Sequence, residues 1–258
     1  MGGKDRYMAP EVVLGKKHAG MESDLYSLAV ILFMLFFVAH PLEGKAVHAC
    51  ACLTPLRIRK YYAESPVFVF DPQNASNRPA KGVDCNVLAR WGLYPGELKM
   101  LFERSFTTGL YDAGYRVREN EWIECFENLI DRVFVCPLCG GEQFYKYHRD
   151  FDKEIICEDC HQKTRKPFLW DDGKTVRALY ASKELSSRFI GEIFDQTVGI
   201  VIESQKHPGL WGICNQTDTD WLATLPNGKE IAVGRGGAVP LFDGVSIKIQ
   251  DKTYQIKI

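Results

Sequence analysis

The sequence lacks the features that would direct it to a membrane or a polyanion. Its longest apolar run, Leu25 to Ala39, has 15 residues, whereas a membrane-spanning helix needs about 20. The N-terminal Met-Gly-Gly-Lys-Asp is not a secretory signal. Lys and Arg total 32 against 33 Asp and Glu, so no global field attracts nucleic acid or anionic lipid. We expect a cytoplasmic protein that binds neither membranes nor nucleic acid.

Internal repeats, low-complexity tracts and blocks of like charge are also missing. The 258 residues allow one large domain or two to three small ones. The nine cysteines are odd in number, and disulfides rarely persist in a reducing compartment. The spacing of the cysteines is therefore more informative than their count.

Four cysteines follow the pattern of a metal site. Two residues separate the members of each pair and 17 separate the pairs, which are Cys136 with Cys139 and Cys157 with Cys160. Two intervening residues let a tight turn direct both thiolates at one ion. Four thiolates complete the coordination shell of zinc and leave no position for water. We expect one structural Zn2+ ion; the alternatives are two redox pairs or a chance spacing.

His148 and His161 are possible replacements for one cysteine ligand. His161 directly follows Cys160 and is expected on the surface, so an all-cysteine site is preferred. A unit that ends near residue 170 is too small to fold on its own core, and zinc should supply much of its folding free energy. The other cysteines show no ligand spacing and are given no function: Cys50, Cys52, Cys85, Cys125 and Cys214.

Helical patterns fill residues 1–135. The run from Leu25 to Ala39 follows a plausible N-cap, Ser23-Asp24, and stops at His40-Pro41. Because it is apolar on nearly every side, it predicts a helix buried inside a domain. Further helices are expected over 46–62, 97–105 and 119–133, with a loop over 71–84.

Alternating apolar residues and Asn-Gly or Asp-Gly turns predict strands from residue 174 onward. The alternating triplets are Val198, Ile200 and Ile202, then Val245, Ile247 and Ile249, then Tyr254, Ile256 and Ile258. We therefore predict an α+β multidomain protein with a helical domain over 1–135, a zinc ribbon over 136–172 and an all-β sandwich over 173–258. The segment Phe168-Leu-Trp170 is expected to pack against the sandwich, since exposed neighbouring aromatic residues are unfavourable.

The helical part resembles the C-terminal part of a protein-kinase C-lobe. Arg6-Tyr-Met-Ala-Pro-Glu11 is similar to the Ala-Pro-Glu motif that closes the activation segment. Ser23-Asp-Leu-Tyr-Ser-Leu-Ala29 looks like the start of the central helix of that lobe, and the segment from His40 to Lys45 is similar to the residues after this helix in bacterial serine/threonine kinases. The segments 101–106 and 116–122 resemble the end of the lobe, with Val117 in place of a usual proline.

This resemblance implies roles for three residues. Glu11 would form a buried ion pair with Arg116, and Asp24 would hold the catalytic loop from the start of the central helix. The alternatives are a surface carboxylate and a plain N-cap. A kinase also needs a Gly-rich loop, a strand lysine, His-Arg-Asp and Asp-Phe-Gly, and none of these precedes the Ala-Pro-Glu motif. We expect this chain neither to bind ATP nor to transfer phosphate, and we expect the face that would meet the missing catalytic loop to be exposed.

The C-terminal part resembles a degenerate forkhead-associated (FHA) sandwich. The segments 210–217, 225–228 and 240–247 are similar to the second half of that family, whose members bind phosphothreonine peptides. Arg188, Ser204 and Arg235 are the candidate phosphopeptide-binding residues, although Ser204-Gln-Lys-His207 is closer to Asn215 than in the family and is interpreted as coincidental. Surface arginines on turns are also common.

The order of the three parts resembles bacterial kinases of tellurite-resistance and stress systems, which occur with a von Willebrand factor A protein and a protein phosphatase. The resemblance implies a non-catalytic region of a Ser/Thr kinase that docks a protein or phosphoprotein partner in phosphorylation-dependent signalling. One alternative is that the chain completes an active kinase with a missing N-terminal half. Another is a nucleic-acid-binding ribbon, based on basic residues interleaved with aromatic ones: Phe144, Tyr145, Lys146, Tyr147, His148, Arg149, Lys163, Arg165, Lys166 and Phe168.

Overall fold

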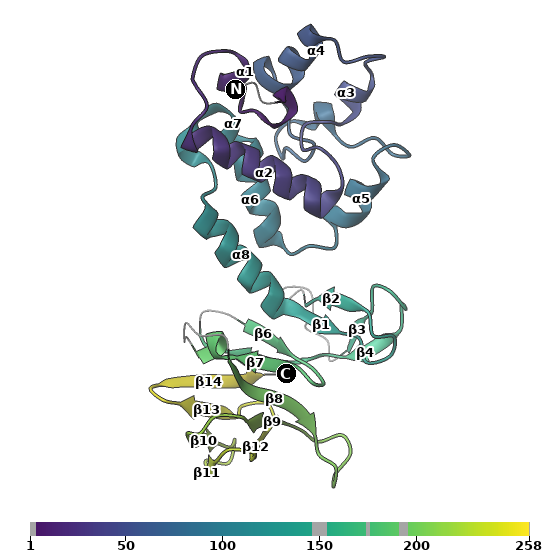
Figure 1. Ribbon diagram of the computed structural model, residues 1–258. Coiled ribbons are helices and arrows are strands. Elements are labelled where there is room, and N and C mark those ends of the chain that lie inside the picture. Colours follow the sequence, from purple (N-terminus) through teal and green to yellow (C-terminus); the bar gives the residue numbers. More distant parts are fainter. Residues whose placement is uncertain (1–3, 146–153, 174–175, 191–195, 258) are drawn as a thin grey trace. The chain divides into compact units, whose positions relative to one another are not determined.

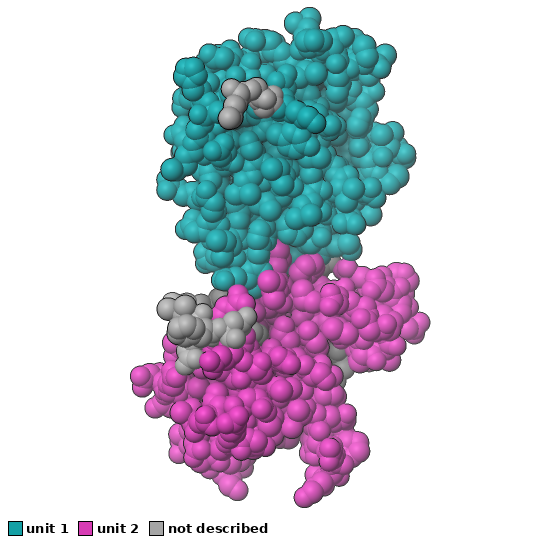
Figure 2. Space-filling view, viewed as in Figure 1, with its two compact units in different colours: residues 1–127 teal, residues 128–258 magenta. Residues whose placement is uncertain are grey.

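The computed structural model describes residues 4–145, 154–173, 176–190 and 196–257. The chain forms two compact units, Met1–Glu127 and Asn128–Ile258 (Figure 2). Helices make up the first unit and antiparallel sheets most of the second, so the expected α+β class is confirmed. The units divide between residues 127 and 128 and not at 135, because the last helix of the helical region runs on into the second unit.

Further helices pack against one side of α2 (Met21–Phe37), the longest helix of the first unit (Figure 1). In chain order the elements are η1 (Asp5–Tyr7), α1 (Pro10–Val13), α2 (Met21–Phe37), α3 (Lys45–His48), α4 (Pro55–Arg59), η2 (Lys60–Glu64), η3 (Ala75–Asn77), α5 (Cys85–Trp91), α6 (Gly96–Phe106), α7 (Thr108–Tyr111), η4 (Ala113–Tyr115) and α8 (Glu119–Arg132).

Local contacts set both ends of α2. The Gly20 N–H donates to the Ser23 hydroxyl, and that hydroxyl donates to the Gly20 carbonyl, so the helix begins at Met21. It ends where Val38 takes the left-handed conformation, with φ of 53°. The helix predicted from the apolar run is therefore present, with its start shifted toward the N-terminus.

One face of α2 is buried and the opposite face is not. The Phe33 ring lies 5.2 Å from the ring of Phe102 and 5.9 Å from that of Phe106. On the other face, Ile31 and Leu35 are 53% and 69% exposed, and Val38 beside them is exposed too. The prediction of a helix buried on all sides is wrong, because no described element covers this stripe. Among the residues that the structure describes, no helix is both long and apolar enough to cross a bilayer.

The single helix expected over 46–62 is wrong as well. Thr54 caps a new helix by accepting from the Arg57 N–H, and Pro55 occupies its first position. Proline is favoured there because it has no N–H to leave unpaired. The loop expected over 71–84 is confirmed apart from the short η3 turn, and helix α5, which the sequence patterns do not indicate, follows it directly.

Two short hairpins begin the second unit. The first pairs β1 (Val133–Val135) with β2 (Glu142–Phe144), and the second pairs β3 (Glu154–Ile156) with β4 (Lys163–Arg165). Each hairpin carries one cysteine pair in its turn.

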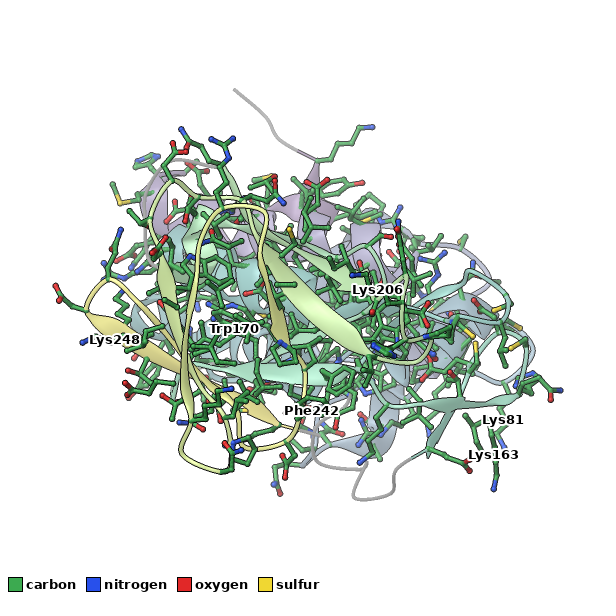
Figure 3. The ribbon with its side chains drawn as sticks, turned by 90° about the horizontal axis from the view of Figure 1, so that it is seen from below. Lys81, Lys163, Trp170, Lys206, Phe242 and Lys248 are labelled. Atoms are coloured by element: carbon green, nitrogen blue, oxygen red, sulfur yellow. The ribbon has the colours of Figure 1, made fainter. Side chains whose placement is uncertain are left out.

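Two antiparallel sheets follow and share one core. One has the order β11-β10-β13-β14-β5-β6 and the other β12-β9-β8-β7. The strands are β5 (Phe168–Asp171), β6 (Val176–Leu179), β7 (Glu184–Ser186), β8 (Thr197–Glu203), β9 (Trp211–Asn215), β10 (Trp221–Thr224), β11 (Glu230–Val233), β12 (Ala238–Pro240), β13 (Ser246–Ile249) and β14 (Lys252–Lys257), and the 3-10 turn η5 (Ser187–Ile190) follows β7. Trp170, labelled in Figure 3, lies in the core with Tyr254, their rings 4.7 Å apart. The segment Phe168-Leu-Trp170 packs against this core, as expected. It is part of β5 in the six-stranded sheet, so the predicted boundary at residue 172, which assigns the segment to the ribbon, is wrong.

The predicted face of β8 is wrong for part of its length. The alternation predicts that Val198, Ile200 and Ile202 share the core face, yet Val198 and Val201 are buried and Ile202 is 39% exposed. The β7–β8 register shifts at Leu185 and Ser186. Such a bulge inserts one residue and moves the following side chains to the opposite face.

Candidate metal centre

The four paired cysteines converge on one point. The sulfurs of Cys136 and Cys160 lie 4.0 Å apart, those of Cys139 and Cys157 lie 3.7 Å apart, and all four lie within 4.8 Å of one another. A disulfide needs about 2.05 Å, so these are free thiols. A tetrahedral ion with metal–sulfur bonds of about 2.3 Å holds its ligands roughly 3.8 Å apart. The sulfurs therefore match the size of a four-thiolate metal site.

The two turns that present the sulfurs have the same backbone pattern. The Gly140 N–H donates to the Cys136 carbonyl at 2.9 Å, and the His161 N–H donates to the Cys157 carbonyl at 3.0 Å. Both Gly140 and His161 have positive φ, 75° and 57°. Glycine adopts this conformation freely, whereas histidine is strained in it. His161 thus occupies a turn position as an exposed residue outside the sulfur cluster.

The pKa values of two thiols in the cluster shift in opposite directions. The Gly141 N–H acts to lower the pKa of the Cys139 thiol, but burial and hydrogen bonds with the neighbouring sulfurs raise it to about 12. Cys136 and Cys157 are each 1% exposed. Burial opposes ionisation of Cys136, but backbone N–H groups of Leu138 and Cys139 bring the pKa of its thiol down to about 7. A buried thiolate of this kind is a metal ligand.

A buried glutamine, which the sequence patterns do not indicate, joins the two hairpins. The Oε1 atom of Gln143 in β2 accepts from the Glu158 N–H in the second cysteine turn at 3.0 Å. Gln143 is buried, so this bond is shielded from water and holds one turn against the other. A lone polar residue in a short strand carries no periodic signal, and only the fold reveals its role.

No other ligand candidate among the described residues joins the cluster. His148 lies outside the described residues. The remaining cysteines are not part of any group of three or more ligand side chains among the residues that the structure describes. The four thiols thus form a site that could hold one metal ion and, with every ligand position filled by sulfur, it has the character of a structural site.

Glu11 and Arg116 meet in the first unit. The guanidinium donates to both carboxylate oxygens of Glu11 at 2.8 and 2.9 Å, to the Gly109 carbonyl at 3.0 Å and to the Glu22 carbonyl at 2.8 Å. Burial acts to raise the pKa of Glu11, but the bonds from Arg116 hold that pKa below its usual value. The pair joins residues 105 positions apart.

Asp24 lies at the surface in the first turn of α2. Among the described residues its side chain has no recorded hydrogen bond, and with Ser27 it borders a cavity of about 450 Å³. The carboxylate is therefore open to a further partner, and it is not the side-chain cap of its own helix, which begins through Ser23.

Ser204 lies apart from Arg188 and Arg235 in the second unit. Ser186, next to the turn that carries Arg188, pairs with Thr197 at the start of β8, whereas Ser204 follows the other end of that strand. Seven strand residues rise about 3.3 Å each and separate the two ends by about 20 Å. Arg235 lies near the Asn215 end of the sheet and pairs with exposed Asp218 at 2.6 Å. Asn215 pairs with Gly199 near the start of β8, so Arg188 and Arg235 both lie toward that end of the sheet. The register separates Ser204 from them, and a phosphate fork of the two arginines stays a prediction.

Two of the four aromatic residues of the nucleic-acid alternative are unavailable for stacking. Tyr145 and Phe168 are buried, and Lys163, which points outward at the edge of Figure 3, pairs with Glu154 at 3.6 Å. Lys146, Tyr147, His148 and Arg149 lie outside the described residues. Base stacking needs exposed rings, so Tyr145 and Phe168 cannot provide it, and the alternative stays a prediction.

The letters His-Arg-Asp do occur once, at 148–150. This tripeptide lies between the two cysteine pairs, far after the Ala-Pro-Glu motif, whereas kinases carry theirs before it. It also lies outside the described residues.

Compared with protein-family models and with curated proteins, the chain matches none.

Proposed function

We propose that this chain is a non-catalytic docking region of a bacterial serine/threonine kinase. In this proposal 1–135 is part of a kinase C-lobe, the cysteine hairpins form a zinc ribbon, and the two-sheet unit is a degenerate FHA-like sandwich. The ribbon and sandwich bind protein partners in phosphorylation-linked signalling in the cytoplasm, and the helical part supports them without binding ATP. A von Willebrand factor A protein and a protein phosphatase are the candidate partners.

The pair between Glu11 and Arg116 carries this proposal. The resemblance assigns these two residues to an ion pair that ties the activation segment to the end of the lobe. Their separation in sequence makes a chance contact with both carboxylate oxygens uncommon, and Arg116 is 4% exposed. A bidentate, buried arginine pair of this kind fixes the orientation of both segments.

Activity and binding assays on the full chain test this proposal together. We expect no ATP hydrolysis, and we expect binding to a purified von Willebrand factor A protein or phosphatase of the same system. Cys157→Ser should abolish that binding, whereas Cys85→Ser, which alters an exposed thiol outside the cluster, should leave it intact. ATP turnover by the pure chain, or equal binding by both variants, would contradict the proposal.

Phosphorylation of the partner is a separate variable. Binding should be compared for phosphothreonine and unmodified forms of the same partner peptide. Since Arg188 and Ser204 lie at opposite ends of β8, we expect Arg188→Ala and Ser204→Ala not to act as a pair. A phospho-preference lost equally in both variants would show that they share a site after all.

We further propose that the ion in the cysteine site is Zn2+. Four thiolates in tetrahedral spacing are typical of structural zinc, and soft sulfur ligands disfavour Mg2+ and Ca2+. Metal analysis of the purified chain should give one zinc per molecule. Replacement by Co2+ should give the absorption of a tetrahedral four-sulfur site, and an octahedral spectrum would overturn the assignment.

The exposed face of α2 favours a second candidate function. Ile31, Leu35 and Val38 form an apolar stripe on the longest helix of the first unit, and Asp24 at the start of that helix is unpartnered among the described residues. A segment carrying the missing catalytic elements would cover such a stripe. Together the two parts would complete an active kinase.

Reconstitution in trans tests the second candidate. Adding a kinase segment with the Gly-rich loop, the lysine, His-Arg-Asp and Asp-Phe-Gly should produce phosphoryl transfer. Leu35→Glu should prevent it, whereas Met100→Glu, which charges an equally exposed residue on α6, should not. Persistent inactivity of the mixture would leave docking as the function of the chain.

A further inference from the structure

A cavity lies beside the first hairpin in the second unit. It has a volume of about 220 Å³, and its wall contains residues from β1, β5, β6, β8 and β9. Apolar side chains dominate this wall, among them Phe134, Phe168, Leu179 and Val201. An apolar cavity of about 150 Å³ already accommodates benzene, so this one is large enough for a ring with a substituent or for a short acyl chain.

One cation belongs to this apolar wall. Lys166 lines the cavity and is 8% exposed, although lysine is rarely buried without a partner. Within the part of the chain that the structure describes, no hydrogen bond or ion pair is recorded for its ammonium group. The following Pro167, also in the wall, restricts Lys166 to extended backbone. The ammonium nitrogen is not among the described side-chain atoms that are both fully buried and without a partner, so it reaches solvent from the wall of the cavity and is open to an anion.

We propose that this cavity binds a small apolar carboxylate, such as a medium-chain fatty acid or an arylalkanoic acid. The apolar body fills the space between the strands, and the carboxylate accepts a hydrogen bond from the Lys166 ammonium. Sites for small ligands combine apolar walls with a few placed polar groups in this way. A neutral ligand would leave the lysine unpaired, and a cationic one would be repelled. The wall of the cavity includes Val135 and Pro137, which flank Cys136, so the metal must be bound when the site is tested. The proposal does not depend on the proposed docking function.

Titration calorimetry of the metal-loaded full chain with octanoate tests the site. Octanamide, which has the same length and no charge, is the ligand control. Methyl NMR signals of Leu179 and Val201 show whether a bound ligand lies in this cavity. Two variants distinguish the contribution of the lysine charge from that of the cavity volume. Lys166→Met removes the ammonium but keeps the length of the side chain, and Ala181→Trp fills part of the cavity from its wall.

Octanoate should bind the wild-type protein at least about tenfold more tightly than octanamide, because a charge-assisted hydrogen bond is involved. Lys166→Met should remove that difference, and Ala181→Trp should weaken both ligands. Lys163→Met, which alters an exposed lysine of β4, should bind octanoate as the wild type does. Octanoate that fails to bind the folded protein, that binds no better than octanamide, or that leaves the two methyl signals unchanged would overturn the proposal.

Discussion

Replacing Arg116 by methionine should strongly destabilise the helical unit. The substitution leaves the Glu11 carboxylate without its guanidinium and the carbonyls of Gly109 and Glu22 without a donor. Removing one partner of a buried ion pair typically costs about 3–5 kcal/mol. We expect a loss of this size in the free energy of unfolding. The matched control is Arg59→Met, because the Arg59–Glu64 pair is half exposed on both sides and such pairs contribute roughly 0–1 kcal/mol.

Hydrogen exchange in urea, read by mass spectrometry on the full chain, measures this loss in each unit. Peptides from α2 and α6 should lose protection in Arg116→Met, while peptides from β8 to β14 serve as an internal reference. A loss no larger than that of Arg59→Met would refute the assignment of Arg116 as the residue that joins the two ends of this unit.

The same pair makes the stability depend on pH in a defined direction. Because the pKa of Glu11 is held below its ordinary value of 4.5, its stabilising effect is complete above that value and is lost as the pH falls through the folded-state pKa. Wild-type protein should lose stability below about pH 4.5 more steeply than Glu11→Gln, measured by the same exchange experiment. Parallel acid profiles for the two proteins would contradict this sign.

Three further perturbations have defined outcomes. Chelation of the metal, or Cys157→Ser, should unfold the hairpins and remove exchange protection from β1 to β4 without affecting α2, and unchanged protection would argue against a metal-dependent fold. Arg177→Met should lower the free energy of unfolding of the second unit by about 3 kcal/mol, because Arg177 pairs with Asp131 and Asp172 at 2.7 and 2.9 Å. Thermal unfolding measures this loss, and a fall of only about a degree in the melting temperature would contradict it. Gly44→Ala should destabilise the first unit, since an added Cβ would lie 2.0 Å from the Asn77 carbonyl oxygen, whereas Gly20→Ala, with open space around it, should be tolerated in the same assay.

Local sequence signals predicted the parts of the structure that depend on neighbours in the chain. The spacing inside Cys136–Cys139 and Cys157–Cys160 is a property of one turn, and both turns form as expected. The alternation of Val245, Ile247 and Ile249 also holds, with all three buried. Such signals need no knowledge of distant partners.

The predictions failed where the burial of a side chain depends on a segment far away in the sequence or on one extra residue in a strand. The face of β8 changes at a bulge that depends on its pairing with β7, and the pattern of Val198, Ile200 and Ile202 contains no sign of it. Hydrophobicity alone predicted α2 as fully buried, but burial also requires a neighbouring element to cover Leu35. The sequence also does not show that Arg188 and Ser204 lie next to opposite ends of β8, and their role in binding phosphopeptides stays a prediction.

The place of β14 in the larger sheet has a consequence for biosynthesis. This strand lies between β13 and β5 in the sheet, and Figure 1 shows it beside β13. Gln255 therefore pairs with both Ser246 and Asp171. Until residues 252–257 leave the ribosome, β5 and β6 are separated from the rest of the sheet. During this time β5, which carries Phe168 and Trp170, lacks its neighbouring strand β14. Pairings between such distant residues form slowly. The nascent chain therefore passes through a stage in which two of the six strands of its largest sheet need protection from aggregation. Chaperone binding should concentrate on these early strands.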